Sequence, residues 1–98
     1  ILIKILEKMN QIFKVVSQSE TITVPSMRSE SGQTYKSNIV LREVDGKHAN
    51  TYVATLFGKD AQCRFYEGEL VVAALYFSVH EHNGQSYQDV VVDEILKL

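Results

Sequence analysis

The dipeptide Asn83-Gly84 joins two runs rich in apolar and β-branched residues, 69–81 and 86–92. A tight two-residue hairpin turn needs positive φ at both central positions, and Asn-Gly is among the pairs that adopt this conformation most readily. In the first run, alternate residues form one apolar set, which we assign to the core: Val71, Ala73, Leu75 and Phe77. The sequence therefore predicts a long two-stranded hairpin.

The same alternation predicts three earlier strands, at residues 11–16, 35–44 and 51–57. Residues 17–34 are rich in Ser, Thr and Glu and contain the single proline, so they predict a long loop with a short edge strand at 21–24. Asp45-Gly46 predicts a turn. Residues 1–10 fit helical spacing and strand composition equally well, and the pattern does not decide between them.

Residues 59–65 are the one short internal stretch with good helix formers, and they follow Gly58. The predicted order is therefore five strands, a long first loop, and a short helix between the third and fourth strands. This is the order of an all-β, five-stranded OB-fold Greek-key barrel. An SH3-like barrel is the main competitor, but its one-turn helix precedes its last strand.

Length and composition limit the remaining possibilities. A chain of 98 residues with 45% hydrophobic content fills one core, so we expect a single domain over residues 1–98. The longest apolar stretch, 70–77, is too short for a membrane span, and the first residues lack the pattern of a secretory signal. A lone cysteine, Cys63, excludes an intrachain disulfide and fits a reducing cytoplasm. The net charge of −2 means that any nucleic-acid binding must use a local basic patch.

Several segments resemble the bacterial single-stranded DNA-binding proteins. The run YVATLFGKDA at 52–61 is similar to that family's third strand, and EGELVVAAL at 67–75 is similar to its turn into a long fourth strand. NGQSY at 83–87 and VVV at 90–92 follow in the family's order, so the likeness covers about residues 32–98. The chain has no tryptophan, and Thr51 and His82 stand where the family often stacks bases, which fits a divergent or mobile-element member. The resemblance implies non-catalytic binding of single-stranded DNA.

Binding of single strands requires flat side chains on which bases stack and cations for the phosphates. Strand alternation assigns Tyr52, Ala54 and Leu56 to the core and places Phe57 and Tyr76 on faces opposite the core. The resemblance puts Phe57 and Lys59 at base- and backbone-contacting positions. We also expect the two hairpin histidines to be solvated or to contact phosphates at mildly acidic pH. The alternative is that Phe57 packs under a loop and Tyr76 lies in a subunit interface. The predicted nucleic-acid contacts are Lys36, Arg42, Val53, Phe57, Lys59, Tyr76, His80 and His82.

Four apolar residues, Val40, Val53, Val72 and Ala74, alternate with the core and would be wet in a monomer. Exposed apolar patches mark interaction surfaces, so we expect a homodimer or homotetramer. The same observation supports a second hypothesis, an OB-fold protein-assembly module that does not bind nucleic acid.

Catalytic and metal sites are not predicted. His80 and His82 share a strand face with only two ligands between them, and no sequence neighbour completes a zinc site. Cys63 has no evident base partner and is expected to be a small buried hydrophobe. Asp89, Asp93 and Glu94 are too spread along the last strand to form a paired-carboxylate site. We therefore expect a protein without cofactor, metal or enzymatic activity.

Overall fold

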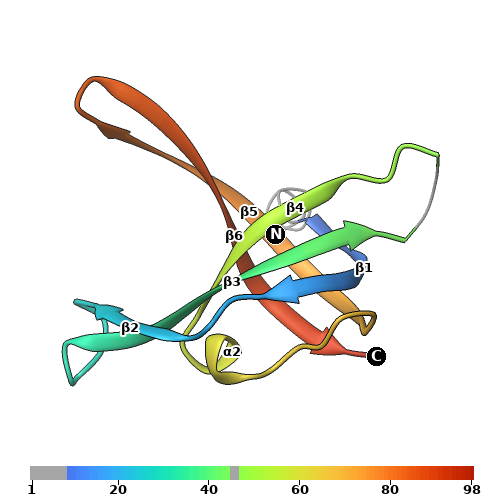
Figure 1. Cartoon of the computed structure of the whole chain (residues 1–98). Coiled ribbons are helices and arrows are strands. Elements are labelled where there is room, and N and C mark those ends of the chain that lie inside the picture. Colours follow the sequence, from blue (N-terminus) through green and yellow to red (C-terminus); the bar gives the residue numbers. More distant parts are fainter. Residues whose placement is uncertain (1–8, 45–46) are drawn as a thin grey trace, which may run out of the picture.

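The computed structural model describes residues 9–44 and 47–98, and this part of the chain forms six strands and one short helix (Figure 1). In chain order they are β1 (Met9–Gln18), β2 (Ile22–Pro25), β3 (Gln33–Glu43), β4 (Thr51–Phe57), α2 (Lys59–Gln62), β5 (Leu70–His82) and β6 (Gln85–Lys97). The strands form one sheet in the order β1-β5-β6-β4-β3-β2, and β1 also pairs with β3, so the sheet closes into a barrel. Five long strands and a helix between β4 and β5 confirm the predicted all-β architecture, with β2 as the expected edge strand.

The barrel core follows from the alternation along its strands. Ala54 and Leu56 of β4 and Val71, Ala73 and Leu75 of β5 are buried, as predicted. β1 and β3 add Phe13, Val15, Ile39 and Leu41 to this core, and β6 adds Val92 and Ile95. The Phe13 ring meets the partly buried Tyr52 ring edge-on, with 5.9 Å between centroids.

Three predictions of burial were wrong. Phe77 is exposed and lies beyond Leu75, the last residue of β5 that pairs with the described part of β1. Ala74 is buried although it lies on the outer face, and it is flanked by β1 on one side and β6 on the other. Cys63 is exposed because α2 ends at Gln62, short of the predicted residue 65, and Cys63 already has extended backbone angles.

The hairpin turn has the predicted geometry, with φ of 53° at Asn83 and 77° at Gly84. β6 continues to Lys97, beyond the predicted end at residue 92, and pairs with β5 at every residue except Asp93. β4 meets β6 only at the pair Thr55↔Val91. The part of this hairpin between residues 76 and 91, which we name the distal hairpin, therefore projects from the barrel as an arm (Figure 1).

A second arm consists of β2 and the part of β3 that pairs with it, from Ile22↔Lys36 to Pro25↔Gln33. The two arms leave the barrel on the same side (Figure 1). The single-domain organisation stays a prediction, and both residues 1–8 and the predicted turn at Asp45-Gly46 lie outside the described residues. Within the described ranges, no helix has the length and apolar character to cross a membrane.

Candidate functional site

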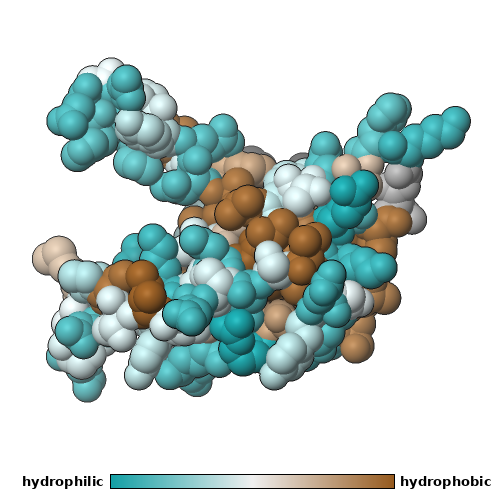
Figure 2. All heavy atoms as spheres, viewed as in Figure 1, coloured by the Kyte–Doolittle hydropathy of each residue, from teal (hydrophilic) through white to brown (hydrophobic). Residues whose placement is uncertain are grey.

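A groove with a volume of about 470 Å³ lies where the two arms leave the barrel. Figure 2 shows the molecule hollowed between the arms, with hydrophobic side chains at the base of the hollow and mostly hydrophilic ones on the distal hairpin. The apolar lining of the groove comes from Val24, Pro25, Phe57, Tyr76, Val91 and Val92. Its remaining lining comes from Ser26, Arg28, Thr34, Gly58, Asp60 and Asp93.

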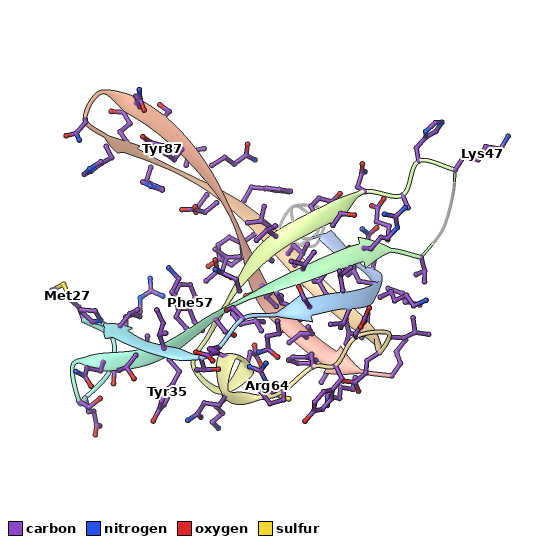
Figure 3. The ribbon with its side chains drawn as sticks, viewed as in Figure 1. Met27, Tyr35, Lys47, Phe57, Arg64 and Tyr87 are labelled. Atoms are coloured by element: carbon purple, nitrogen blue, oxygen red, sulfur yellow. The ribbon has the colours of Figure 1, made fainter. Side chains whose placement is uncertain are left out.

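The groove brings together the two aromatic residues that the sequence singled out. The pairs Tyr76↔Val91 and Thr55↔Val91 place Tyr76 and Thr55 on the same face of the sheet, and Phe57 follows Thr55 by two residues. The exposed fractions of Phe57 and Tyr76 are 43% and 42%. Figure 3 shows Phe57 on the side of the β2–β3 arm that faces the distal hairpin, with Tyr35 on the other side. Two flat apolar faces are therefore accessible in one groove.

Basic side chains lie on the same outer face of β3 and β4. Lys36 is directly opposite Phe57, and Arg28 lines the groove from the loop after β2. Arg42 is opposite Thr51, six residues or about 20 Å along β3 from Lys36. Between them the exposed Val53 is opposite Val40. The face thus offers cations at both ends and apolar surface between them.

The two hairpin histidines share a strand face with Tyr76, because His80 and His82 follow it at even spacing along β5. His80 is held in place: its ring stacks on Tyr87 with 5.5 Å between centroids, and its Nδ1 lies 2.9 Å from Asp89 Oδ2. In the described ranges, no group of three His, Cys, Asp or Glu side chains is arranged to hold a metal ion.

Of the predicted contacts, Phe57 and Tyr76 line the groove and the other six do not. Lys36, Arg42 and Val53 lie along the β3–β4 face, and His80 and His82 lie on the distal hairpin. Lys59 begins α2. Sequence reasoning missed Arg28, Thr34, Asp60 and Asp93, which come from four separate segments. No local pattern marks Arg28, Thr34 or Asp93 as groove residues. The signal for Asp60 was its place three residues after Phe57, immediately beyond the Gly58-Lys59 step.

Two of the groove residues are carboxylates. The pKa of Asp60 is raised from its ordinary value, first because burial penalises its charged form and second because of the negative charge of Glu94. The α2 segment that carries Asp60 is tied to the loop between β1 and β2. Ala61 is buried, and the Thr21 hydroxyl donates a 2.7 Å hydrogen bond to its carbonyl oxygen. The groove is therefore acidic at this wall.

The known structures similar to this chain include three with 14–16% sequence identity. The second OB-fold domain of replication protein A from Methanococcus maripaludis is 16% identical, with a TM-score of 0.64 over 91% of this chain and 81% of that domain. This protein has the OB fold. The SSB domain of a Synechococcus protein is 14% identical, with a TM-score of 0.58 over 91% of this OB-fold chain and 92% of that one.

A small single-stranded DNA-binding protein from Streptomyces coelicolor, also 14% identical, gives a TM-score of 0.50 over 92% of both chains. No family model and no curated protein sequence matches the chain. The similarity at these low identities establishes the OB fold.

Proposed function

We propose that this OB-fold protein binds single-stranded DNA without catalysis, with bases stacked in the groove between its two arms. The observation that carries the proposal is the pair of exposed aromatic side chains, Phe57 and Tyr76, in one groove. Aromatic side chains in an OB-fold groove stack bases irrespective of sequence, at about 1–3 kcal/mol per base. A single-stranded DNA-binding protein and an SSB domain among the structural neighbours support the same ligand.

The phosphates would be contacted by basic residues along the β3–β4 face, at Lys36 beside Phe57 and Arg42 at the far end. Arg28 would add a cation at the other wall of the groove. The proposed contacts also include Val53, Lys59, His80 and His82. The two histidines would contact the bound DNA from the distal hairpin. This local arrangement accounts for binding by a chain whose net charge is −2.

The test is fluorescence anisotropy of a labelled thymidine oligomer of about 15 nucleotides, within the site sizes that OB folds use. We expect saturable binding that weakens as salt rises, and much weaker binding to a duplex of matching length, because stacked base pairs cannot enter the groove. No binding of the single strand at tens of micromolar protein and low salt would overturn the proposal.

A second candidate, protein assembly, is supported by a different surface. The register pairs Ile12↔Val72 and Val72↔Leu96 place three apolar side chains in one row on the outside of β1, β5 and β6. Ile12 and Leu96 are 46% and 68% exposed. The predicted apolar face is thus divided between two surfaces. Val72 lies in this outer row, whereas Val40 and Val53 lie on the β3–β4 face.

We propose that this outer row forms the interface of a homodimer or homotetramer, because exposed apolar rows mark interaction surfaces. Light scattering coupled to gel filtration measures the assembly. A Leu96→Glu variant is expected to shift it toward monomer without changing oligonucleotide contacts in the groove. A wild-type protein that is monomeric at high micromolar concentration would refute the interface.

A further inference from the structure

The wall of the groove next to Phe57 carries a carboxylate whose hydrogen-bonding capacity is unused. Asp60 lines the groove three residues after Phe57, and within residues 9–44 and 47–98 its carboxylate accepts no hydrogen bond. The side chain is half-buried, and the neighbouring Ala61 is anchored by Thr21. The Asp60 carboxylate can therefore accept a hydrogen bond from a ligand without a change in the position of its segment.

A second carboxylate reaches the same groove because of an irregularity in β6. Leu75 pairs with Val92 while Ala74 pairs with Glu94, so Asp93 is the extra residue of a β-bulge. Bulges occur beside functional sites, where they redirect a side chain. Here the bulge residue lines the groove, so Asp93 and Asp60 both place negative charge near one end of the stacking surface.

Carboxylates accept hydrogen bonds and do not donate them, so they distinguish bases by the donors on their edges. Guanine presents two adjacent donors, the N1 hydrogen and the N2 amino group, which match the two oxygens of one carboxylate. Thymine presents a single donor between two carbonyl oxygens, and those oxygens would face the carboxylate unfavourably. A base stacked on Phe57 would direct such an edge toward the groove walls.

We propose that Asp60 makes the groove selective for guanine over thymine. The inference rests on the proposed binding of single strands and adds a base preference to it. Bidentate recognition of a base edge is worth about 1–3 kcal/mol, so we expect guanine at this position to tighten binding by about 5- to 150-fold.

The experiment compares three labelled oligomers of about 15 nucleotides, all thymidine except for the central base. That position carries thymine, guanine or hypoxanthine, the base of inosine. Inosine retains the N1 hydrogen of guanine and lacks the N2 amino group, so it isolates the second donor. We expect the affinity order guanine, inosine, thymine, measured by anisotropy with wild-type protein.

The matched variants are Asp60→Asn and Glu67→Gln, which remove one negative charge each. Glu67 is exposed in the turn before β5 and does not line the groove, so Glu67→Gln should keep the guanine preference. Asp60→Asn should abolish most of that preference, because the amide offers one acceptor and one donor, while thymine binding is kept or improved.

The outcomes separate this inference from the proposed function. Equal binding of all three oligomers, or a guanine preference that survives Asp60→Asn, overturns the inference and leaves single-strand binding standing. Failure to bind any of the three oligomers overturns the proposed function itself. Tighter binding of every oligomer by Asp60→Asn, without prior guanine preference, would mean that Asp60 only repels phosphates, and this also overturns the inference.

Discussion

Replacing Phe57 with alanine removes one of the two flat faces in the groove. A phenylalanine side chain buries on the order of 200 Å² when fully covered. With 43% of Phe57 exposed in the free protein, roughly 85 Å² remains for a base to cover. At about 25 cal/mol per Å², this area corresponds to about 2 kcal/mol, in agreement with about 1–3 kcal/mol for stacking one base. We therefore expect Phe57→Ala to weaken binding by about 30-fold.

The assay is anisotropy of a thymidine oligomer at fixed salt, with urea unfolding of each variant measured in parallel. Tyr35 supplies the matched control, since it is 44% exposed and lies on the opposite side of the same arm (Figure 3). Tyr35→Ala removes a similar aromatic area and should cost similar stability, yet leave binding within about twofold of wild type.

Two results would refute the reasoning. The first is a folded Phe57→Ala protein that binds as tightly as wild type, since the groove then does not stack bases on this ring. The second is an equal loss of affinity in Tyr35→Ala, which would assign the effect to general loosening of the arm.

Four further predictions concern charge and packing. Lys36→Gln should lower the slope of log affinity against log salt by about 0.7, measured by titration at several salt concentrations, since one phosphate contact is lost. Phe13→Ala, at a fully buried position, should cost about 3–5 kcal/mol of unfolding free energy in urea. Hydrogen bonds from the Asn50 backbone N–H and then the Gln11 side chain lower the pKa of Glu43. The charged Glu43 should therefore stabilise the fold above its ordinary pKa of 4.5, and this contribution should be lost as pH falls through the lowered value. The melting temperatures of wild type and Glu43→Gln, compared across this pH range, measure the contribution. Burial raises the pKa of Asp60, so its charged form destabilises the fold above that pKa. Asp60→Asn should therefore have a higher melting temperature than wild type at pH 7, and the difference should vanish below the ordinary pKa of 3.8.

The parts of the fold that depend on neighbouring residues were predictable. Two-residue alternation identified the buried sets of β4 and β5, and Asn83-Gly84 identified the hairpin, because both signals act within a few residues. The structure confirms these elements. Phe77 shows the limit: its alternation matches the core set, but it is exposed beyond Leu75, where the pairing of β5 with the described part of β1 ends.

The candidate site divides in the same way. Phe57 and Tyr76 could be proposed because side-chain direction follows from strand alternation. Asp60 and Asp93 could not be placed together, because their proximity depends on barrel closure and on the β6 bulge. The position of Arg28 depends on the loop after β2, whose composition predicts a loop and no particular direction for its side chains.

The bulge at Asp93 lets both halves of β6 keep their facing toward β5 although one extra residue lies between them. Side chains alternate along a strand, so an extra residue without a bulge would turn one half of β6 to the opposite face. Deleting residue 93 would place Val92 directly beside Glu94, opposite Leu75 and Ala74, and would keep Val91 opposite Tyr76. The strand would become regular, and the groove would lose the Asp93 carboxylate. Insertions or deletions at the tip, beside Asn83-Gly84, would instead lengthen or shorten the arm when made in equal numbers on both strands. The lining of the groove and the reach of the distal hairpin can therefore change independently between related chains.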